Sequence, residues 1–140
     1  MQWRGTCGMG VMAKAPQAGR SKTRLCPPLR GEQAALLSAA FLRDITENIA
    51  CAARQVPVQG VVAYAPAGNE ASFAGMLAPG TSLLLADGSP SMPPDVQGFG
   101  RCLLHAVRGL FDQGFAAACV VNSDSPTLPT TYLVAAAQFL

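Results

Sequence analysis

Apolar residues come in short blocks along this chain, and polar turns separate the blocks. The run "GMGVMA" leads into Lys14 and is ended by a proline at position 16, which predicts a buried strand over 7–13. Comparable blocks predict strands around 58–64, over "TSLLLA" at 81–86 and within "FAAACVV" at 115–121. Short blocks of Ala, Leu and Val are expected where helices cover strands on both faces.

Two longer segments repeat their apolar residues at helical spacing instead. In "EQAALLSAAFLRDITENIACAAR", Leu37, Phe41, Ile45 and Ile49 recur every four residues, which predicts a helix over about 32–54. A second stripe, "LLHAVRGLF" at 103–111, predicts a helix that Gly114 terminates. Shorter helices are predicted for "NEASFAGML" at 69–77 and for "TTYLVAAAQFL" after position 129.

Strand and helix therefore alternate four times along the chain. This alternation favours a mostly parallel sheet with right-handed crossovers and helices on its faces. The predicted fold class is α/β, with three α/β/α layers in a single domain over 1–140. Ligands of such sheets bind at the carboxyl ends of the strands. The polar turns at 14–29 and 122–129 both follow predicted strands, so we expect them to face one pocket.

Composition narrows the function classes. The net charge is +2 and 13% of the residues are charged, which leaves no broad basic face for nucleic acid. The five cysteines form no CxxC pair, so neither a zinc site nor a disulfide framework is indicated. No run approaches the roughly 18 apolar residues of a membrane span, and no signal peptide is visible. We expect a soluble, cytoplasmic protein with a local positive site.

That positive site is the segment "KAPQAGRSKTRLCPPL" at 14–29. Lys14, Arg20, Lys22 and Arg24 surround Gly19, and this composition suits phosphate because glycine lets the backbone approach while the cations neutralise charge. The segment is not a Walker A loop, and the chain has no GxGxxG fingerprint. The competing interpretation is a solvated basic loop without a ligand.

The turn "VVNSDSPTLP" supplies a carboxylate. Asp124 follows an apolar strand, where it could hold Mg²⁺ or Mn²⁺ against a phosphate. The alternative is a structural turn, because Asn, Ser, Asp and Pro all favour turns. Elsewhere His105 and Cys26 receive no functional role, and Phe99 is a weak candidate for stacking on a base.

Four segments together resemble a known family of small bacterial GT-A-type proteins, called glycosyltransferase-like or selenodomain-associated transferases. These are relatives of nucleotidyltransferases. The segments are "VMAKAPQAGRSKTRLCPPL", "FLRD", "QGFGRCLLHAV" and "VVNSDSPTLP".

The resemblance implies a Rossmann-like nucleotide-diphospho-sugar transferase fold whose first loop holds the phosphates of a nucleoside triphosphate or nucleotide sugar. On this resemblance Lys22 and Arg24 are the catalytic cations, and Asp124 is the ligand of Mg²⁺ or Mn²⁺. The expected substrate-binding residues are Lys14, Gly19, Arg20, Thr23, Gly100, Arg101 and Ser123.

The chain also departs from that family. A later Asp-Gly-Gly motif is absent, so we expect a domain that lacks its C-terminal part. Two functions stay open: a metal-dependent transferase that moves a glycosyl or nucleotidyl group, or a catalytically inactive nucleotide-binding remnant or interaction module. An uncovered sheet edge would favour a homo-oligomer.

Overall fold

The computed structural model describes residues 3–15, 19 and 22–140. Its centre is a sheet of β1 (Cys7–Lys14), β2 (Val58–Ala65), β3 (Ser82–Leu85) and β4 (Ala117–Asn122) in the order β3-β2-β1-β4. Every pairing is parallel, with Cys7 in register with Val58 on one side and with Ala117 on the other. The α/β class predicted from the sequence is confirmed, and the sheet is parallel throughout rather than mostly parallel.

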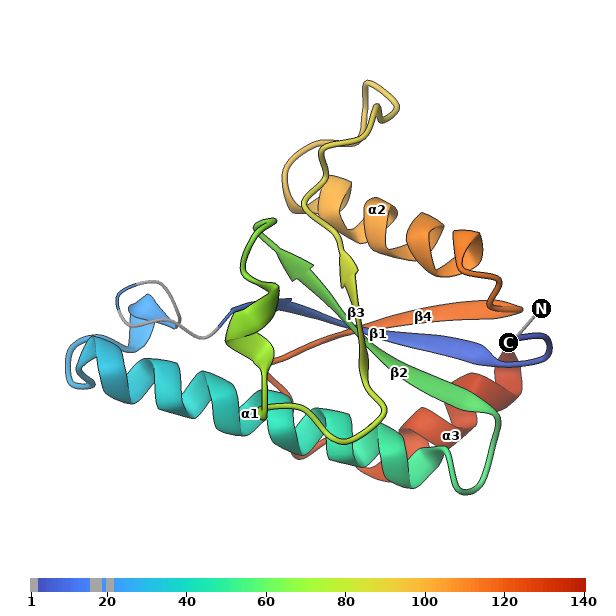
Figure 1. The fold of residues 1–140 in the computed structure, drawn as a ribbon, viewed down its shortest axis with the longest axis horizontal. Helices are drawn as coiled ribbons and strands as arrows, with labels where there is room; N and C mark the ends of the chain where they lie inside the picture. The colour runs from blue at the N-terminus through green and yellow to red at the C-terminus, as the bar shows by residue number, and fades with distance from the viewer. Residues whose placement is uncertain (1–2, 16–18, 20–21) are drawn as a thin grey trace.

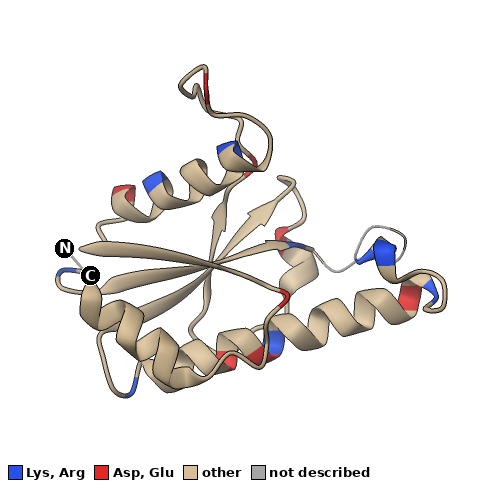
Figure 2. Ribbon diagram, turned by 180° about the vertical axis from the view of Figure 1, so that it is seen from behind, with Lys and Arg blue, Asp and Glu red and all other residues tan. Residues whose placement is uncertain are grey.

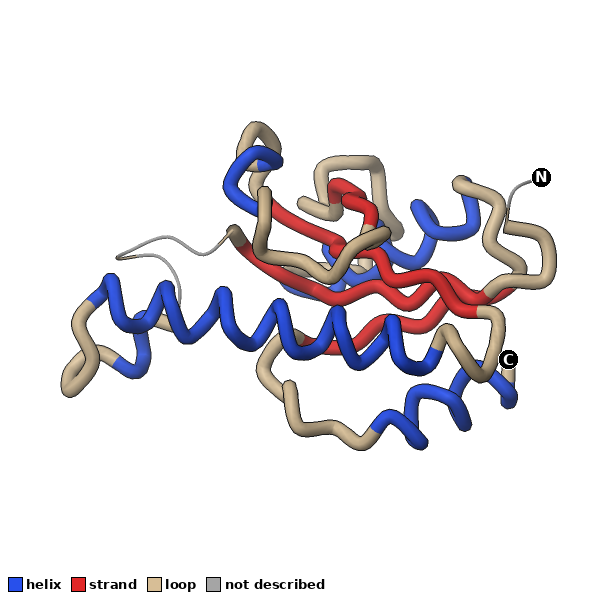
Figure 3. The backbone as a smooth tube through the Cα atoms, turned by 60° about the horizontal axis from the view of Figure 1, so that its bottom comes forward, coloured by secondary structure: helices blue, strands red, loops and turns tan. Residues whose placement is uncertain are grey.

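Helices cover both faces of this sheet (Figure 1). The long helix α1 (Gly31–Ala52) and the shorter α3 (Thr130–Phe139) pack side by side on one face. Helix α2 (Phe99–Asp112) lies on the opposite face, against β1, β3 and β4. Figure 3 shows the three layers from another direction, with α1 and α3 below the strands. Helices on both faces bury the two sides of a parallel sheet.

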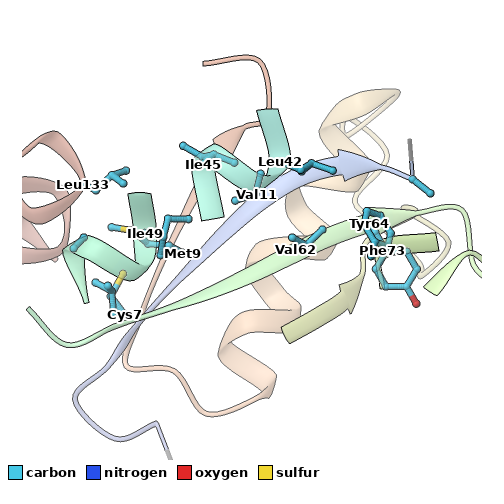
Figure 4. Packing of buried hydrophobic residues seen from close by; sticks show 13 residues of the cluster. Cys7, Met9, Val11, Leu42, Ile45, Ile49, Val62, Tyr64, Phe73 and Leu133 are labelled. Atoms are coloured by element: carbon cyan, nitrogen blue, oxygen red, sulfur yellow. The ribbon is translucent and has the colours of Figure 1, made fainter. Parts of the chain in front are cut away.

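The larger part of the core lies between the sheet and α1. Leu42, Ile45 and Ile49 of α1 are at most 1% exposed and meet Met9 and Val11 of β1 (Figure 4). These helix positions recur at three- and four-residue spacing, which places them on one stripe of α1. Ile45 and Ile49 belong to the predicted stripe. The two other predicted members, Leu37 and Phe41, are only partly buried, and Leu42 lies in the core in their place.

The α2 face is packed more closely because β1 presents glycines to it. A Cβ at Gly8 would lie 2.8 Å from Phe115, and one at Gly10 would lie 3.4 Å from Leu110. Since side chains alternate between the faces of a strand, Met9 and Val11 fill the α1 side while the glycines admit α2.

Several predicted boundaries differ from the structure. The expected helix at 69–77 is only a 3-10 turn, η2 (Glu70–Phe73), because Gly75 turns away with a φ of 75°. Helix α2 begins at Phe99, so it takes in the last residues of the loop expected at 87–100. Strand β1 continues one residue further than predicted, to Lys14.

Charged residues are almost absent from the sheet and lie on helices and loops (Figure 2). None of the helices in the described part of the chain combines the length and apolar character that a membrane crossing requires.

Candidate functional site

A pocket of about 520 Å³ opens at the carboxyl ends of the strands. The strand order changes direction beside β1, with β2 and β3 on one side and β4 on the other. Such a switch point leaves a crevice, and open α/β sheets bind their ligands there. The lining comes from loops, strand ends and the first turns of α2: Met12, Ala13, Lys14, Lys22, Thr23, Arg24, Ser38, Ala63, Ala65, Ala86, Phe99, Cys102, Asn122, Ser123 and Asp124.

The basic segment returns to the pocket through Lys22 and the 3-10 turn η1 (Thr23–Leu25). Lys22 has a φ of 49°, a left-handed conformation that is uncommon for a residue with a side chain. Its side chain is only 9% exposed, and its Nζ lies 4.6 Å from the centre of the Phe41 ring. A cation over an aromatic face is attracted to it, so Phe41 of α1 helps to hold the ammonium in place.

Asp124 faces these cations from the turn after β4. Lys22 donates a hydrogen bond to its Oδ1, and Nη2 of Arg24 lies 3.2 Å from its Oδ2. The hydrogen bond from Lys22, with a smaller contribution from Arg24, holds the pKa of the Asp124 carboxyl below its ordinary value. The carboxylate is therefore ionised at neutral pH.

The turn that carries Asp124 is tied down at both ends. The backbone N–H of Asp124 donates to Oδ1 of Asn122 at 3.0 Å, a local bond typical of Asx turns. Further along, Nδ2 of Asn48 in α1 donates to the Leu128 carbonyl at 2.6 Å, and the Thr130 hydroxyl donates to Oδ1 of Asn48. A side chain of α1 thus anchors the far end of the acidic turn.

Most of the candidate residues from the sequence meet in this pocket. The six that line it are Lys14, Lys22, Thr23, Arg24, Ser123 and Asp124. Gly19 lies in a turn with a φ of 78° and is not among the lining residues, so its role in phosphate binding stays a prediction. Arg20 lies outside the described residues.

Gly100 and Arg101 do not line the pocket. The Arg101 guanidinium donates instead to the carbonyl oxygens of Gly88, at 2.9 and 3.1 Å, and of Pro90, at 3.0 Å. Arg101 therefore holds the loop after β3 against α2. A substrate-binding role for Gly100 or Arg101 stays a prediction.

The structure adds residues that the sequence did not single out. Ser38 of α1 reaches the pocket, and Ala63, Ala65 and Ala86 form a wall of small side chains at the ends of β2 and β3. A serine inside a helical stripe carries no signal of its own, whereas the strand-end alanines could have been found from the rule that strand ends bind ligands. Phe99, the weak stacking candidate, stands beside this wall and is 63% exposed.

The side chains of the pocket provide only some of the ligands that a divalent cation needs. The described residues contain no group of three or more His, Cys, Asp or Glu side chains that could hold a metal. Mg²⁺ is commonly bound through one or two carboxylates together with substrate phosphates and water. Asp124 supplies one hard oxygen donor group, so the residues fit a cation site that a phosphate ligand completes.

These features define a class of protein: an α/β protein with the fold of a nucleotide-diphospho-sugar transferase. The fold matches the crystal structure of a protein from Desulfovibrio desulfuricans G20, provisionally called a nucleotide-diphospho-sugar transferase, with a TM-score of 0.74 and 22% identity. The match covers 94% of this chain but 53% of the other, so the chain spans about half the length of that protein. At this identity the likeness concerns the fold.

A family can also be assigned. Residues 48–140 match the family described as "Uncharacterized protein conserved in bacteria (DUF2064)", and the chain belongs to it. The matched range includes Asp124 and begins after Lys22 and Arg24. No curated protein matches the chain. The resemblance seen in the sequence is thus confirmed for the fold, and the reaction that it implies belongs to the proposal below.

Proposed function

We propose that this chain binds a nucleoside triphosphate or nucleotide sugar with a divalent cation and transfers a nucleotidyl or glycosyl group to an acceptor. The observation that carries the proposal is the meeting of Lys14, Lys22 and Arg24 with Asp124 at the switch point of the sheet. Three cations at one strand-end crevice suit a polyphosphate, because ammonium and guanidinium groups neutralise and orient its oxygens.

The two reactions differ in the bond that breaks. In nucleotidyl transfer an acceptor oxygen attacks the α-phosphorus and pyrophosphate leaves, whereas in glycosyl transfer the acceptor attacks the anomeric carbon and a nucleoside diphosphate leaves. Lys22 and Arg24 would stabilise the negative charge that develops on the leaving phosphate in either case. Asp124 would hold Mg²⁺ or Mn²⁺, which neutralises phosphate charge when bound.

A second candidate is nucleotide binding without transfer. The acidic residues of the pocket favour this candidate. Among the described lining residues Asp124 is the single carboxylate, so no second carboxylate is present to act as a base. His105, a conventional proton acceptor, is not in the lining, and its Nδ1 accepts a hydrogen bond from the backbone of Gly88 at 3.1 Å. A remnant or interaction module with this pocket would bind donors and leave them intact.

Binding is tested by thermal unfolding with ATP, GTP, CTP, UTP, UDP-glucose and GDP-mannose, each with and without Mg²⁺ or Mn²⁺. A ligand at a hundred times its dissociation constant should stabilise the fold by about 2.7 kcal/mol. No shift with any donor and either cation would refute the site. Release of pyrophosphate or of a nucleoside diphosphate then separates the two reactions, and binding without either product supports the second candidate.

A further inference from the structure

The pocket holds a carboxylate where the proposed function needs an anion. One oxygen of Asp124 accepts from Lys22 and the other from Arg24, so each catalytic cation has its own carboxylate oxygen. A phosphate group offers the same chemistry, since it presents several anionic oxygens to amines and guanidinium groups. The protein therefore carries an internal competitor for its own ligand.

Lys22 makes this competition specific. Its side chain is 9% exposed and its ammonium is held between the Phe41 ring and Asp124, so an external anion has to compete with the carboxylate for it. Arg24, in contrast, is 73% exposed and has further donors free to point into solvent. Lys22, the more buried of the two cations, therefore determines most of the free energy needed to separate Asp124 from its partners.

We propose that Asp124 is an internal gate on the phosphate site: it occupies Lys22 and Arg24 in the free protein, and a divalent cation that binds its carboxylate releases both for the ligand. The inference rests on the proposed function, and it adds that cation and phosphate bind with positive coupling through this carboxylate. Reciprocity requires that an anion on Lys22 and Arg24 also frees Asp124 for the cation.

The gate and a simple metal-ligand role predict different effects of the same substitution on anion binding without metal. If Asp124 only held the cation, Asp124→Asn would leave metal-free anion binding unchanged and weaken metal-dependent binding. If Asp124 is the competitor, Asp124→Asn should bind inorganic pyrophosphate more tightly than the parent when EDTA removes all divalent cations. The gain should lie between about two- and thirtyfold, the range for releasing two ion pairs of ordinary surface strength.

Calorimetry with pyrophosphate in EDTA makes this comparison, with two control variants. Asp112→Asn removes one negative charge at the end of α2, far along the helix from the pocket lining. Asp87→Asn removes one just after Ala86, at the pocket edge, where the carboxylate bonds the Ser89 backbone and faces His105. Both should bind like the parent. A gain in Asp87→Asn as large as that in Asp124→Asn would assign the effect to net charge and overturn the gate.

If Asp124→Asn does not fold, Asp124→Ser replaces it, because serine is also a turn-forming residue. The parent protein also gives an independent readout, because Lys14 and Lys22 are its two lysines. Acylation followed by mass spectrometry should show little labelling of Lys22 relative to exposed Lys14, and Mn²⁺ alone should raise that ratio. An unchanged ratio at saturating Mn²⁺ would contradict the release step.

The outcomes separate this inference from the proposed function. Nucleotide binding by the parent, combined with no metal-free gain in Asp124→Asn, rejects the gate and leaves the function standing. Absence of binding by every protein to every donor and to pyrophosphate rejects both.

Discussion

Lys22 and Arg24 look alike in the sequence but differ in their surroundings. Lys22 is almost buried and touches an aromatic ring, whereas Arg24 reaches Asp124 from solvent through one nitrogen. Exposed ion pairs contribute little free energy to folding or binding, while charged hydrogen bonds shielded from water contribute more. The two cations should therefore have unequal weight in ligand binding.

Lys22→Ala should weaken metal-dependent nucleotide binding by about tenfold or more, as expected for the loss of a charged hydrogen bond. Arg24→Lys keeps the charge but loses the planar donor, and should cost about threefold. Titration calorimetry against the donor selected by thermal unfolding measures both. Equal affinities in the parent and both variants would indicate a solvated basic loop.

Cys7 should make the free energy of unfolding depend on pH. Its thiol is 5% exposed, and burial, with a contribution from nearby Cys119, raises its pKa from 9.0 to about 11. The unfolded chain releases this proton first. The free energy of unfolding should therefore be at its full value below pH 9 and fall between about pH 9 and 11.

At most about 2.7 kcal/mol is lost in this way, since two pKa units correspond to that free energy. Urea unfolding at several pH values should show a shallower decline in Cys7→Ala than in the parent. Cys51→Ala, which changes an exposed cysteine of α1, should keep the steep decline. The same slope in all three proteins would exclude Cys7 as the source.

At the scale of elements, the spacing between β1 and α2 depends on glycine. A methyl group at Gly8 would come within 2.8 Å of the Phe115 ring, whereas one at Gly10 would find ordinary contact distances. Gly8→Ala should destabilise the protein by about 1–3 kcal/mol through overpacking. Gly10→Ala, on the same face of the same strand, should cost clearly less, because its added methyl group would lie 3.4 Å from the nearest side chains and cause no overlap. Chemical denaturation compares them, and equal losses would refute the close packing of α2.

The helices and strands were largely predictable from the sequence, because short stretches of the chain determine them. Ile45 and Ile49 mark the buried face of α1 by spacing alone, and short apolar blocks mark the strands, whereas Leu42 was not among the predicted positions. The helix expected at 69–77 is wrong because periodicity ignores the left-handed turn at Gly75.

The candidate site was predictable only in its parts. Lys14, Lys22, Arg24 and Asp124 were found because charged residues in polar turns after strands signal a crevice, whereas Thr23 and Ser123 came from the family resemblance. The pairing of Lys22 with Asp124 could not be found, because it depends on strand order and on the support of Phe41. The contact of the Arg101 guanidinium with the Gly88 carbonyl could not be found either, because sequence spacing does not show it, and the predicted role of Arg101 in substrate binding stays a prediction.

For the whole molecule, self-association remains a prediction, and the strand order gives it a physical basis. β4 is an edge of the described sheet, and its sequence AACVVN carries no charge that would discourage pairing with another strand. Sedimentation velocity over a range of concentrations should show a rising average mass. A single monomeric species at all concentrations would contradict the prediction.

The position of β1 in the sheet affects how the protein is made. β1 is translated before β2 and β4, yet it lies between them, and its pairing with β4 joins Cys7 to Ala117. Contacts so distant in the chain form late, because the closure of a long loop precedes any gain from them. The pocket, built where β1 meets β4, is then complete only after the ribosome has released both strands. A pocket ligand should accordingly slow unfolding and leave the rate of refolding nearly unchanged.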